Sequence, residues 1–220
     1  MATSTPQTSG HAPRRGRRAD SDKHRAILVE ARRMFTRAGF EAANMDRLAA
    51  VAGVSKATIY KHFQSKEQLL QALLDDLLGH LPAPATLVDR GQGPLPERLL
   101  TIGQQLCALA TSQLVLDARA LLDAAAKSGW TAPGAFWTCC VAPYRAAFAA
   151  MLDQTADDDG LEITDAEMAT SQFFALVASE PFLRLASGAP PLTKAALTGH
   201  VTAAVGTFLR AYRQAPAART

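Results

Sequence analysis

Apolar residues recur at helical spacing along the first third of the chain. Between residues 22 and 39 they follow steps of three and four, at Ile27, Ala31, Met34, Phe35 and Ala38. This spacing predicts an amphipathic helix that Gly39 ends. Two shorter helices are predicted over residues 45–52 and 55–62, with Gly53 between them.

A fourth helix is predicted from Ser65, because Ser65-Lys66-Glu67-Gln68 has the S-x-x-Q form of a capping box. Its leucines continue the pattern to about Gly79. Proline and glycine are frequent in residues 80–96, and since both interrupt helices, this segment is expected to be a linker. Five longer helices are predicted beyond it, near residues 96–111, 113–128, 132–154, 164–187 and 192–213.

No run of alternating β-branched residues indicates a sheet, so the sequence predicts an all-α protein of about nine helices. Its 220 residues are 48% hydrophobic and 20% charged, which is ordinary for a globular chain with a sizeable core. No stretch of 18 uncharged apolar residues occurs, and a transmembrane helix is not expected. The basic start lacks the apolar core of a secretory signal, and three cysteines are too few for a disulfide framework. A cytoplasmic location is therefore expected.

Charge is distributed unevenly. Residues 1–66 contain 13 Lys and Arg against 5 Asp and Glu, whereas residues 67–220 contain 10 against 15. A basic segment on an acidic remainder suggests that one end meets a polyanion. The run from Arg14 to Arg18 supplies half of the excess in a segment poor in large apolar residues, so residues 1–20 are expected to form a flexible arm. Such an arm could enter a DNA minor groove or act as a non-specific solvated tail.

The two short helices have the features of a helix-turn-helix. Ala49 and Ala52 are small where the helices must cross, Gly53 permits a positive φ in the turn, and Ser55 can cap the second helix. The outward positions of that second helix are Lys56, Ala57, Tyr60 and Lys61. They share one face and suit a DNA major groove, although an ordinary helical hairpin would also place lysines on its solvent side.

The residues from Ile27 to Leu74 resemble the N-terminal domain of the TetR family of bacterial repressors. The segment that carries most of the resemblance is Tyr60-Lys61-His62-Phe63-Gln64-Ser65-Lys66-Glu67-Gln68-Leu69-Leu70, with Ala52-Gly53-Val54-Ser55 before it. The resemblance implies a DNA-binding set of Asn44, Arg47, Ser55, Lys56, Ala57, Thr58, Tyr60, Lys61, His62 and Lys66.

Within that set, the resemblance places Lys56, Ala57 and Tyr60 at bases, and Thr58, His62 and Lys66 at phosphates. Asn44 stands where the family usually has threonine; it can still cap the helix. Asp46 would repel phosphate unless it pairs with Arg47.

The segment Ser171-Gln172-Phe173-Phe174-Ala175-Leu176 resembles AcrR- and AefR-like members of the family. The resemblance implies a C-terminal helical domain for ligand sensing and dimerisation over residues 69–213, after a helix-turn-helix domain over residues 21–68 and before a tail over residues 214–220. The last helix carries an apolar stripe that is expected to form a dimer interface or to pack within the monomer: Leu197, Val201, Val205, Phe208 and Tyr212.

An apolar pocket between the middle helices is expected to bind a small apolar or aromatic ligand. Its candidate residues, each of which taken alone is more often ordinary core than pocket lining, are Cys107, Phe136, Trp137, Cys140, Phe148, Phe173 and Phe174. The pair Cys139-Cys140 could instead sense oxidants, although no His or Cys stands at zinc spacing and no metal site is expected.

The sequence thus predicts a homodimeric regulator that binds double-stranded DNA at a pseudo-palindromic operator and represses until a small-molecule effector releases it. A dimeric DNA-binding regulator without a ligand is the alternative. No catalytic motif for nucleophile, phosphate or zinc chemistry is present, so neither an enzyme nor a cofactor is expected, and no membrane partner.

Overall fold

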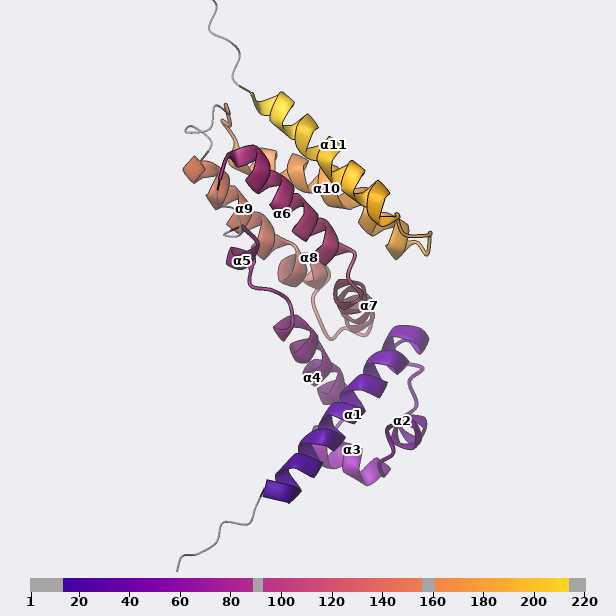
Figure 1. Cartoon of the computed structure of the whole chain (residues 1–220). Coiled ribbons are helices and arrows are strands. Elements are labelled where there is room, and N and C mark those ends of the chain that lie inside the picture. Colours follow the sequence, from indigo (N-terminus) through magenta and orange to yellow (C-terminus); the bar gives the residue numbers. More distant parts are fainter. Residues whose placement is uncertain (1–13, 89–92, 156–160, 214–220) are drawn as a thin grey trace, which may run out of the picture. The chain divides into compact units, whose positions relative to one another are not determined.

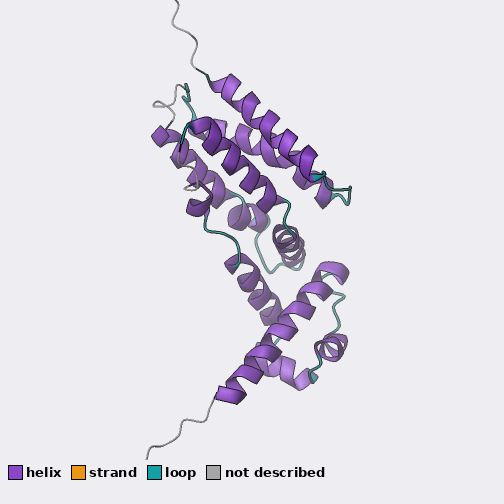
Figure 2. Cartoon of the chain, viewed as in Figure 1, coloured by secondary structure: helices purple, strands orange, loops and turns teal. Residues whose placement is uncertain are grey.

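A computed structural model describes residues 14–88, 93–155 and 161–213. All named elements within these residues are helices, and Figure 2 shows helices joined by loops. They are α1 (Arg14–Ala38), α2 (Met45–Ala52), α3 (Lys56–Phe63), α4 (Lys66–Gly79), α5 (Pro84–Val88), α6 (Leu95–Ala110), α7 (Gln113–Lys127), α8 (Ala135–Cys140), α9 (Ala142–Thr155), α10 (Ala166–Ala186) and α11 (Lys194–Tyr212). The all-α prediction is confirmed.

The chain forms two compact units, Met1–Leu73 and Leu74–Thr220. In the N-terminal unit, α1 packs against α2, and α2 packs against α3 (Figure 1). The apolar stripe of α1 is turned inward, so that Ile27, Ala31 and Phe35 are at most 1% exposed. Leu48 of α2 and Ile59 of α3 are fully buried with them. Burial of these side chains stabilises the two short helices, which would not be stable in isolation.

Helix α1 begins earlier than the sequence suggested. Residues 14–20, assigned to a flexible arm, belong to α1, and residues 1–13 of that arm lie outside the described residues. The physical reason is that arginine and alanine are good helix formers, so an ordered helix continues through a segment that has no large apolar residues of its own.

In the C-terminal unit, α10 is the central helix and packs against α6, α9 and α11 (Figure 1). Its Phe173 is fully buried, with its ring centre 4.5 Å from that of Phe148 of α9 and 5.2 Å from that of Phe208 of α11. These aromatic contacts join three helices around one core. Gly103 of α6 allows the close approach of α11, because a Cβ there would lie 3.0 Å from a methyl carbon of Val201.

Two helix boundaries in this unit differ from the prediction. The linker over residues 80–96 contains α5, which begins at Pro84 because proline has no amide hydrogen to lose at the first position of a helix. The single helix expected over residues 132–154 is two helices, broken at Val141. Pro143 explains the break, since it lacks the amide hydrogen and crowds the preceding turn.

The apolar stripe of α11 packs within its own monomer. Val201, Val205 and Phe208 are 1–4% exposed and belong to the core, and Tyr212 donates a 2.8 Å hydrogen bond to Gln172 of α10. Leu197 is partly buried against the same core. The burial of Val201, Val205 and Phe208 favours packing within the monomer for these three residues, whereas Leu197 and Tyr212 are only partly buried.

Among the described residues, no single helix is long and apolar enough to cross a membrane. Helices α6 and α7 meet that test only when taken together, and they are bent by 51° at the break between them.

Candidate nucleic-acid interface and ligand pocket

The turn between α2 and α3 is fixed by caps on both helices. The side-chain oxygen of Asn44 accepts hydrogen bonds from the backbone N–H groups of Asp46, at 2.8 Å, and of Arg47, at 3.1 Å. Gly53 has a φ of 66°, the left-handed conformation that glycine adopts without steric cost. Ser55 accepts a 3.1 Å bond from the N–H of Thr58 and so caps α3. The two helices are thereby joined in a defined geometry.

Helix α3 has one buried face and one exposed face. Ile59 and Phe63 are at most 3% exposed, whereas Lys56, Ala57, Tyr60 and Lys61 are exposed, as is Arg47 of α2. A helix that shows two lysines, a tyrosine hydroxyl and a small residue to solvent can donate hydrogen bonds to base edges and phosphates.

The first lysine of this face already has a partner in the protein. The ammonium of Lys56 lies 2.9 Å from Oδ1 and 3.0 Å from Oδ2 of Asp46. Hydrogen bonding to Asp46 and the attraction of its negative charge raise the pKa of Lys56 above its usual 10.5. Sequence reasoning had considered Arg47 as the partner of Asp46, and the structure instead pairs Asp46 with a base-contacting candidate.

The three candidates for phosphate contacts differ in their surroundings. Thr58 shares a 2.8 Å hydrogen bond with the hydroxyl of Ser55, and Lys66 donates a 3.0 Å bond to the carbonyl of Glu41. His62 faces inward: its side chain is 11% exposed, and Nε2 lies 3.3 Å from a carboxylate oxygen of Asp20. In this conformation the buried Nε2 is not available to a phosphate.

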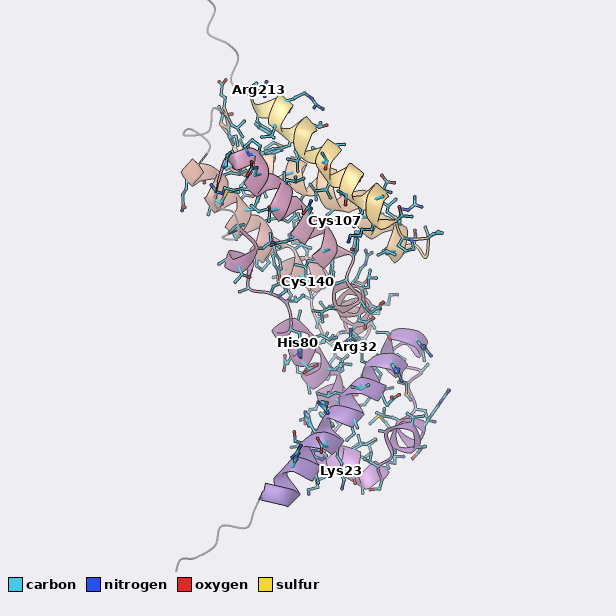
Figure 3. All side chains as sticks on the ribbon, in the orientation of Figure 1. Lys23, Arg32, His80, Cys107, Cys140 and Arg213 are labelled. Carbon is cyan, nitrogen blue, oxygen red and sulfur yellow. The ribbon has the colours of Figure 1, made fainter. Side chains whose placement is uncertain are left out.

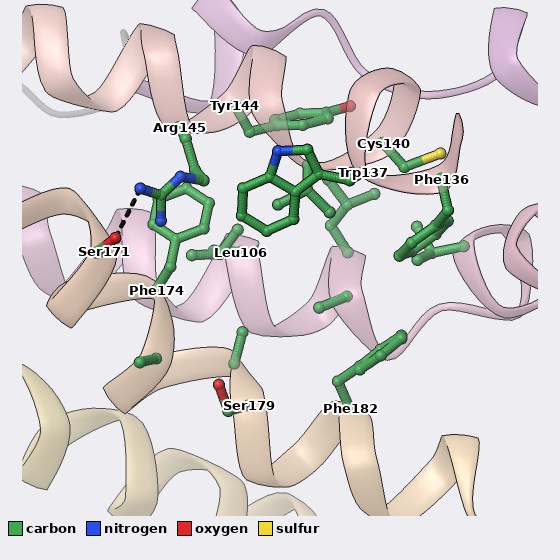
Figure 4. A pocket seen from close by; sticks show the side chains of 16 residues that line it. Leu106, Phe136, Trp137, Cys140, Tyr144, Arg145, Ser171, Phe174, Ser179 and Phe182 are labelled. Carbon is green, nitrogen blue, oxygen red and sulfur yellow. Dashed lines mark hydrogen bonds between the residues drawn. The ribbon is translucent and has the colours of Figure 1, made fainter. Parts of the chain in front are cut away.

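A cavity of about 400 Å³ lies in the C-terminal unit between α6, α7, α8, α9 and α10 (Figure 4). Most of its lining is apolar: Leu106, Leu109, Ala110, Val115, Phe136, Trp137, Cys140, Val141, Phe174, Ala175, Ala178 and Phe182. The polar side chains that line it are those of Tyr144, Arg145, Ser171 and Ser179. Its size falls in the usual range of small-molecule sites.

The structure places four of the seven pocket candidates at the cavity, namely Phe136, Trp137, Cys140 and Phe174. The other three, Cys107, Phe148 and Phe173, do not line it; all are 0% exposed and belong to the core. The reason is that one helix bears both a cavity face and a core face, and the residue type alone does not distinguish them.

Sequence reasoning missed Arg145, and a signal for it was available. Arg145 is the only charged residue between Lys127 and Asp153 in the sequence. A charge within a segment that is otherwise expected to be buried needs a polar partner. The structure shows that contact as a 2.7 Å hydrogen bond from Nη2 of Arg145 to the hydroxyl of Ser171.

The cysteines are free thiols in different surroundings. Cys107 and Cys140 are buried on α6 and α8 (Figure 3), whereas Cys139 is exposed. Burial, helped by the neighbouring Cys139, raises the pKa of Cys140 to about 11. A protonated thiol is a poor nucleophile, which disfavours oxidant sensing through this residue. Within the described ranges, no three His, Cys, Asp or Glu side chains are grouped to hold a metal ion.

A capped helix-turn-helix with an exposed cationic second helix is the arrangement with which helix-turn-helix proteins bind DNA. Residues 27–73 match the profile of the bacterial regulatory proteins of the tetR family, and residues 97–214 match the C-terminal domain of AefR-like transcriptional repressors. The chain belongs to the TetR family of DNA-binding transcriptional regulators.

Proteins that are similar to this chain in sequence or in structure are also transcriptional regulators. The transcriptional activator FasR of Mycolicibacterium smegmatis is 45% identical over 62 residues, which are 28% of each chain. A TetR-family regulator from Pseudomonas syringae is 31% identical, with a TM-score of 0.66 over 88% of this chain and 98% of its own. The flavonoid-responsive regulator FrrA is 27% identical, with a TM-score of 0.59 over 89% and 100%. The chain spans about a quarter to two fifths of the length of the curated relatives it matches.

Proposed function

We propose that the protein is a homodimeric repressor that binds a pseudo-palindromic operator in the cytoplasm and leaves it when a small apolar or aromatic effector occupies the pocket. The observation that carries the proposal is the exposed face of α3, with Lys56, Ala57, Tyr60 and Lys61 held outward by a capped turn. Contacts of this face with base edges would supply specificity, and lysine contacts with phosphates would supply affinity.

The proposed effector site is the cavity of the C-terminal unit. Its volume and apolar lining support an effector more than the alternative of a regulator without a ligand. FrrA, which shares this fold at 27% identity, responds to flavonoids, and an aromatic effector fits the rings of Phe136, Trp137, Phe174 and Phe182 here. To release DNA, the effector must bind the DNA-incompetent conformation more tightly than the competent one.

The proposed dimer interface is the outer face of α10 and α11, since the core buries the inner face. Met168 and Leu183 of α10 are 53% and 59% exposed. On α11 the outward residues include Gly199 and Ala203, which are small enough for close helix packing. Sedimentation at several concentrations tests this: Leu183→Arg should give a monomer where the unchanged protein is a dimer.

A fluorescence-anisotropy titration against DNA fragments from the upstream region of the gene tests DNA binding. The titration is carried out at a low and at a higher salt concentration. At the higher one, a single fragment should stay bound while the others dissociate, because contacts with bases resist salt and contacts with phosphates do not. Lys61→Ala should weaken binding and flatten the salt dependence. The matched control, Lys127→Ala, changes an exposed lysine in the last turn of α7; it removes the same charge and should change neither the affinity nor its salt dependence.

If all fragments bind equally well and all of this binding is lost at the higher salt concentration, the proposal of a specific operator is contradicted. In vitro transcription from the bound fragment then decides the sign of regulation, with a lower transcript yield expected for a repressor.

A further inference from the structure

The pocket of the C-terminal unit contains a single charged side chain. Among its described lining residues, only Arg145 carries a formal charge. The side chain of Arg145 is 16% exposed, so most of its solvation has been lost. A buried cation is stable only when negative charges or hydrogen-bond acceptors make up for its lost solvation. The groups that already contact Arg145 therefore show what a ligand would have to supply.

The protein itself compensates Arg145 only in part. Its guanidinium carbon lies 5.4 Å from the ring centre of Trp137 and 6.0 Å from that of Phe174. Its acidic partner is Glu167, whose carboxylate lies 3.8 Å from Nη2 of Arg145 and whose side chain is 72% exposed. A pair at this distance with an exposed carboxylate contributes little. The hydrogen bond to Ser171 and the 3.8 Å contact with Glu167 involve the same nitrogen, Nη2.

We propose that the pocket selects apolar or aromatic compounds that bear one carboxylate, which Arg145 binds. The inference rests on the proposed effector role of the pocket and names the class of effector. A guanidinium presents parallel N–H donors that match the two oxygens of a carboxylate. The hydrogen bond to Ser171 and the nearby rings of Trp137 and Phe174 restrict the guanidinium, which lowers the cost of ordering it.

The rest of the pocket fits the apolar body of such a compound. Figure 4 shows Arg145 and Phe174 at one end, Phe136 and Phe182 at the other, and Trp137 between them. The Phe136 and Phe182 rings are stacked, with centres 6.1 Å apart. A compound with its carboxylate at Arg145 would extend its apolar part over Trp137 towards these rings.

Isothermal titration calorimetry with two matched probes, 2-naphthoate and its neutral analogue 2-naphthamide, tests the proposal on the full chain. The unchanged protein should bind 2-naphthoate about tenfold or more tightly than 2-naphthamide, because a hydrogen bond to a charged group contributes more than a neutral one. Arg145→Met should abolish this preference and leave the affinity for 2-naphthamide within about threefold.

Two further variants separate the role of Arg145 from a general effect on the fold. Arg119→Met removes a cation that lies outside the lining, 5.1 Å from the ring centre of Phe182, and should keep the preference. Arg145→Lys keeps the charge without the planar fork and should retain a reduced preference. If Arg145→Met does not fold, the probe pair on the unchanged protein and on Arg145→Lys still decides the question.

Equal affinity for the two probes, tighter binding of the amide, or no binding of either would overturn the proposal. A preference that survives Arg145→Met would overturn it as well. Because the calorimetry contains no DNA, a negative result there contradicts only the proposed selectivity of the pocket and leaves the proposed DNA-binding function untouched. If 2-naphthoate is preferred but no fragment is bound specifically, the regulator proposal fails and the selectivity of the pocket stands.

Discussion

Gly103 of α6 offers a direct test of how closely the C-terminal helices pack. A Cβ at this position would lie 3.0 Å from a methyl carbon of Val201, 3.4 Å from one of Val205 and 3.6 Å from one of Val177. Carbon atoms in a relaxed core are about 3.5–4.0 Å apart. Gly103→Ala therefore forces α6 away from α11 by a few tenths of an ångström, or forces Val201 out of its rotamer.

Two opposing contributions set the size of the effect. Replacing glycine by alanine inside a helix stabilises the helix by about 1 kcal/mol. Overpacking a well-filled core costs about 1–3 kcal/mol. We expect Gly103→Ala to lower the free energy of unfolding by about 1 kcal/mol, taking the middle of the second range.

Gly199 of α11 provides the matched control. It also lies inside a helix, and a Cβ there would meet nothing within 4 Å. At a protomer concentration low enough to keep the protein monomeric, where Gly199 stays outside the proposed dimer interface, Gly199→Ala should show the helix contribution alone and raise the free energy of unfolding by up to about 1 kcal/mol. Since both are glycine-to-alanine changes, the difference between the two variants measures the packing cost at Gly103.

The assay is urea unfolding followed by circular dichroism, at one fixed protomer concentration because a dimer's stability depends on concentration. A second concentration shows whether either alanine changes assembly. Equal stabilisation by the two alanines would refute the close contact of α6 with α11 and the reasoning built on it.

Three shorter predictions follow from the two sites. Asp46→Asn frees the ammonium of Lys56 and removes a negative charge beside the DNA face, so DNA affinity should rise, most clearly at low salt. An unchanged affinity in anisotropy titrations would show that the Asp46–Lys56 pair does not oppose DNA binding. Ser55→Ala removes the cap of α3 and should lower the stability of the N-terminal unit by about 1 kcal/mol, measured by thermal unfolding. The comparison is Ser21→Ala, which changes an exposed serine inside α1 rather than one at a helix start. The raised pKa of Cys140 stabilises the folded state at pH values below the ordinary thiol pKa of 9.0, and this stabilisation should be lost as pH rises towards about 11. Cys140→Ala should lessen that loss of stability. At pH 7.5 a thiol reagent should modify Cys139 well before Cys140, and rapid labelling of Cys140 would contradict its burial.

Much of the N-terminal unit could be predicted because its signals are local. The caps Asn44 and Ser55 and the glycine of the turn act within a few residues of themselves, and the structure places each in its expected role. The family was recognisable for the same reason, since the residues that shape and expose α3 are close together in the chain. What local signals did not show is that His62 turns inward towards Asp20, because Asp20 is 42 positions away.

The C-terminal unit was harder to read for a physical reason. Apolar periodicity identifies which face of a helix is buried, and it does not identify what buries it. The stripe of Val201, Val205 and Phe208 suited a second subunit or the chain's own core equally well, and the fold decided for the core. Phe173 and Phe174 are adjacent in sequence, yet one lies in the core and the other lines the cavity.

The sequence by itself determined the helical class, the helix-turn-helix and the exposed cationic face, because helix periodicity, capping and turn formation depend on near neighbours. The tertiary structure alone decided which apolar residues surround a cavity, which of them fill the core, and that Arg145 and Ser171 meet inside the pocket. These two residues are 26 positions apart on different helices, and only the packing of α9 against α10 brings them within a hydrogen bond of each other.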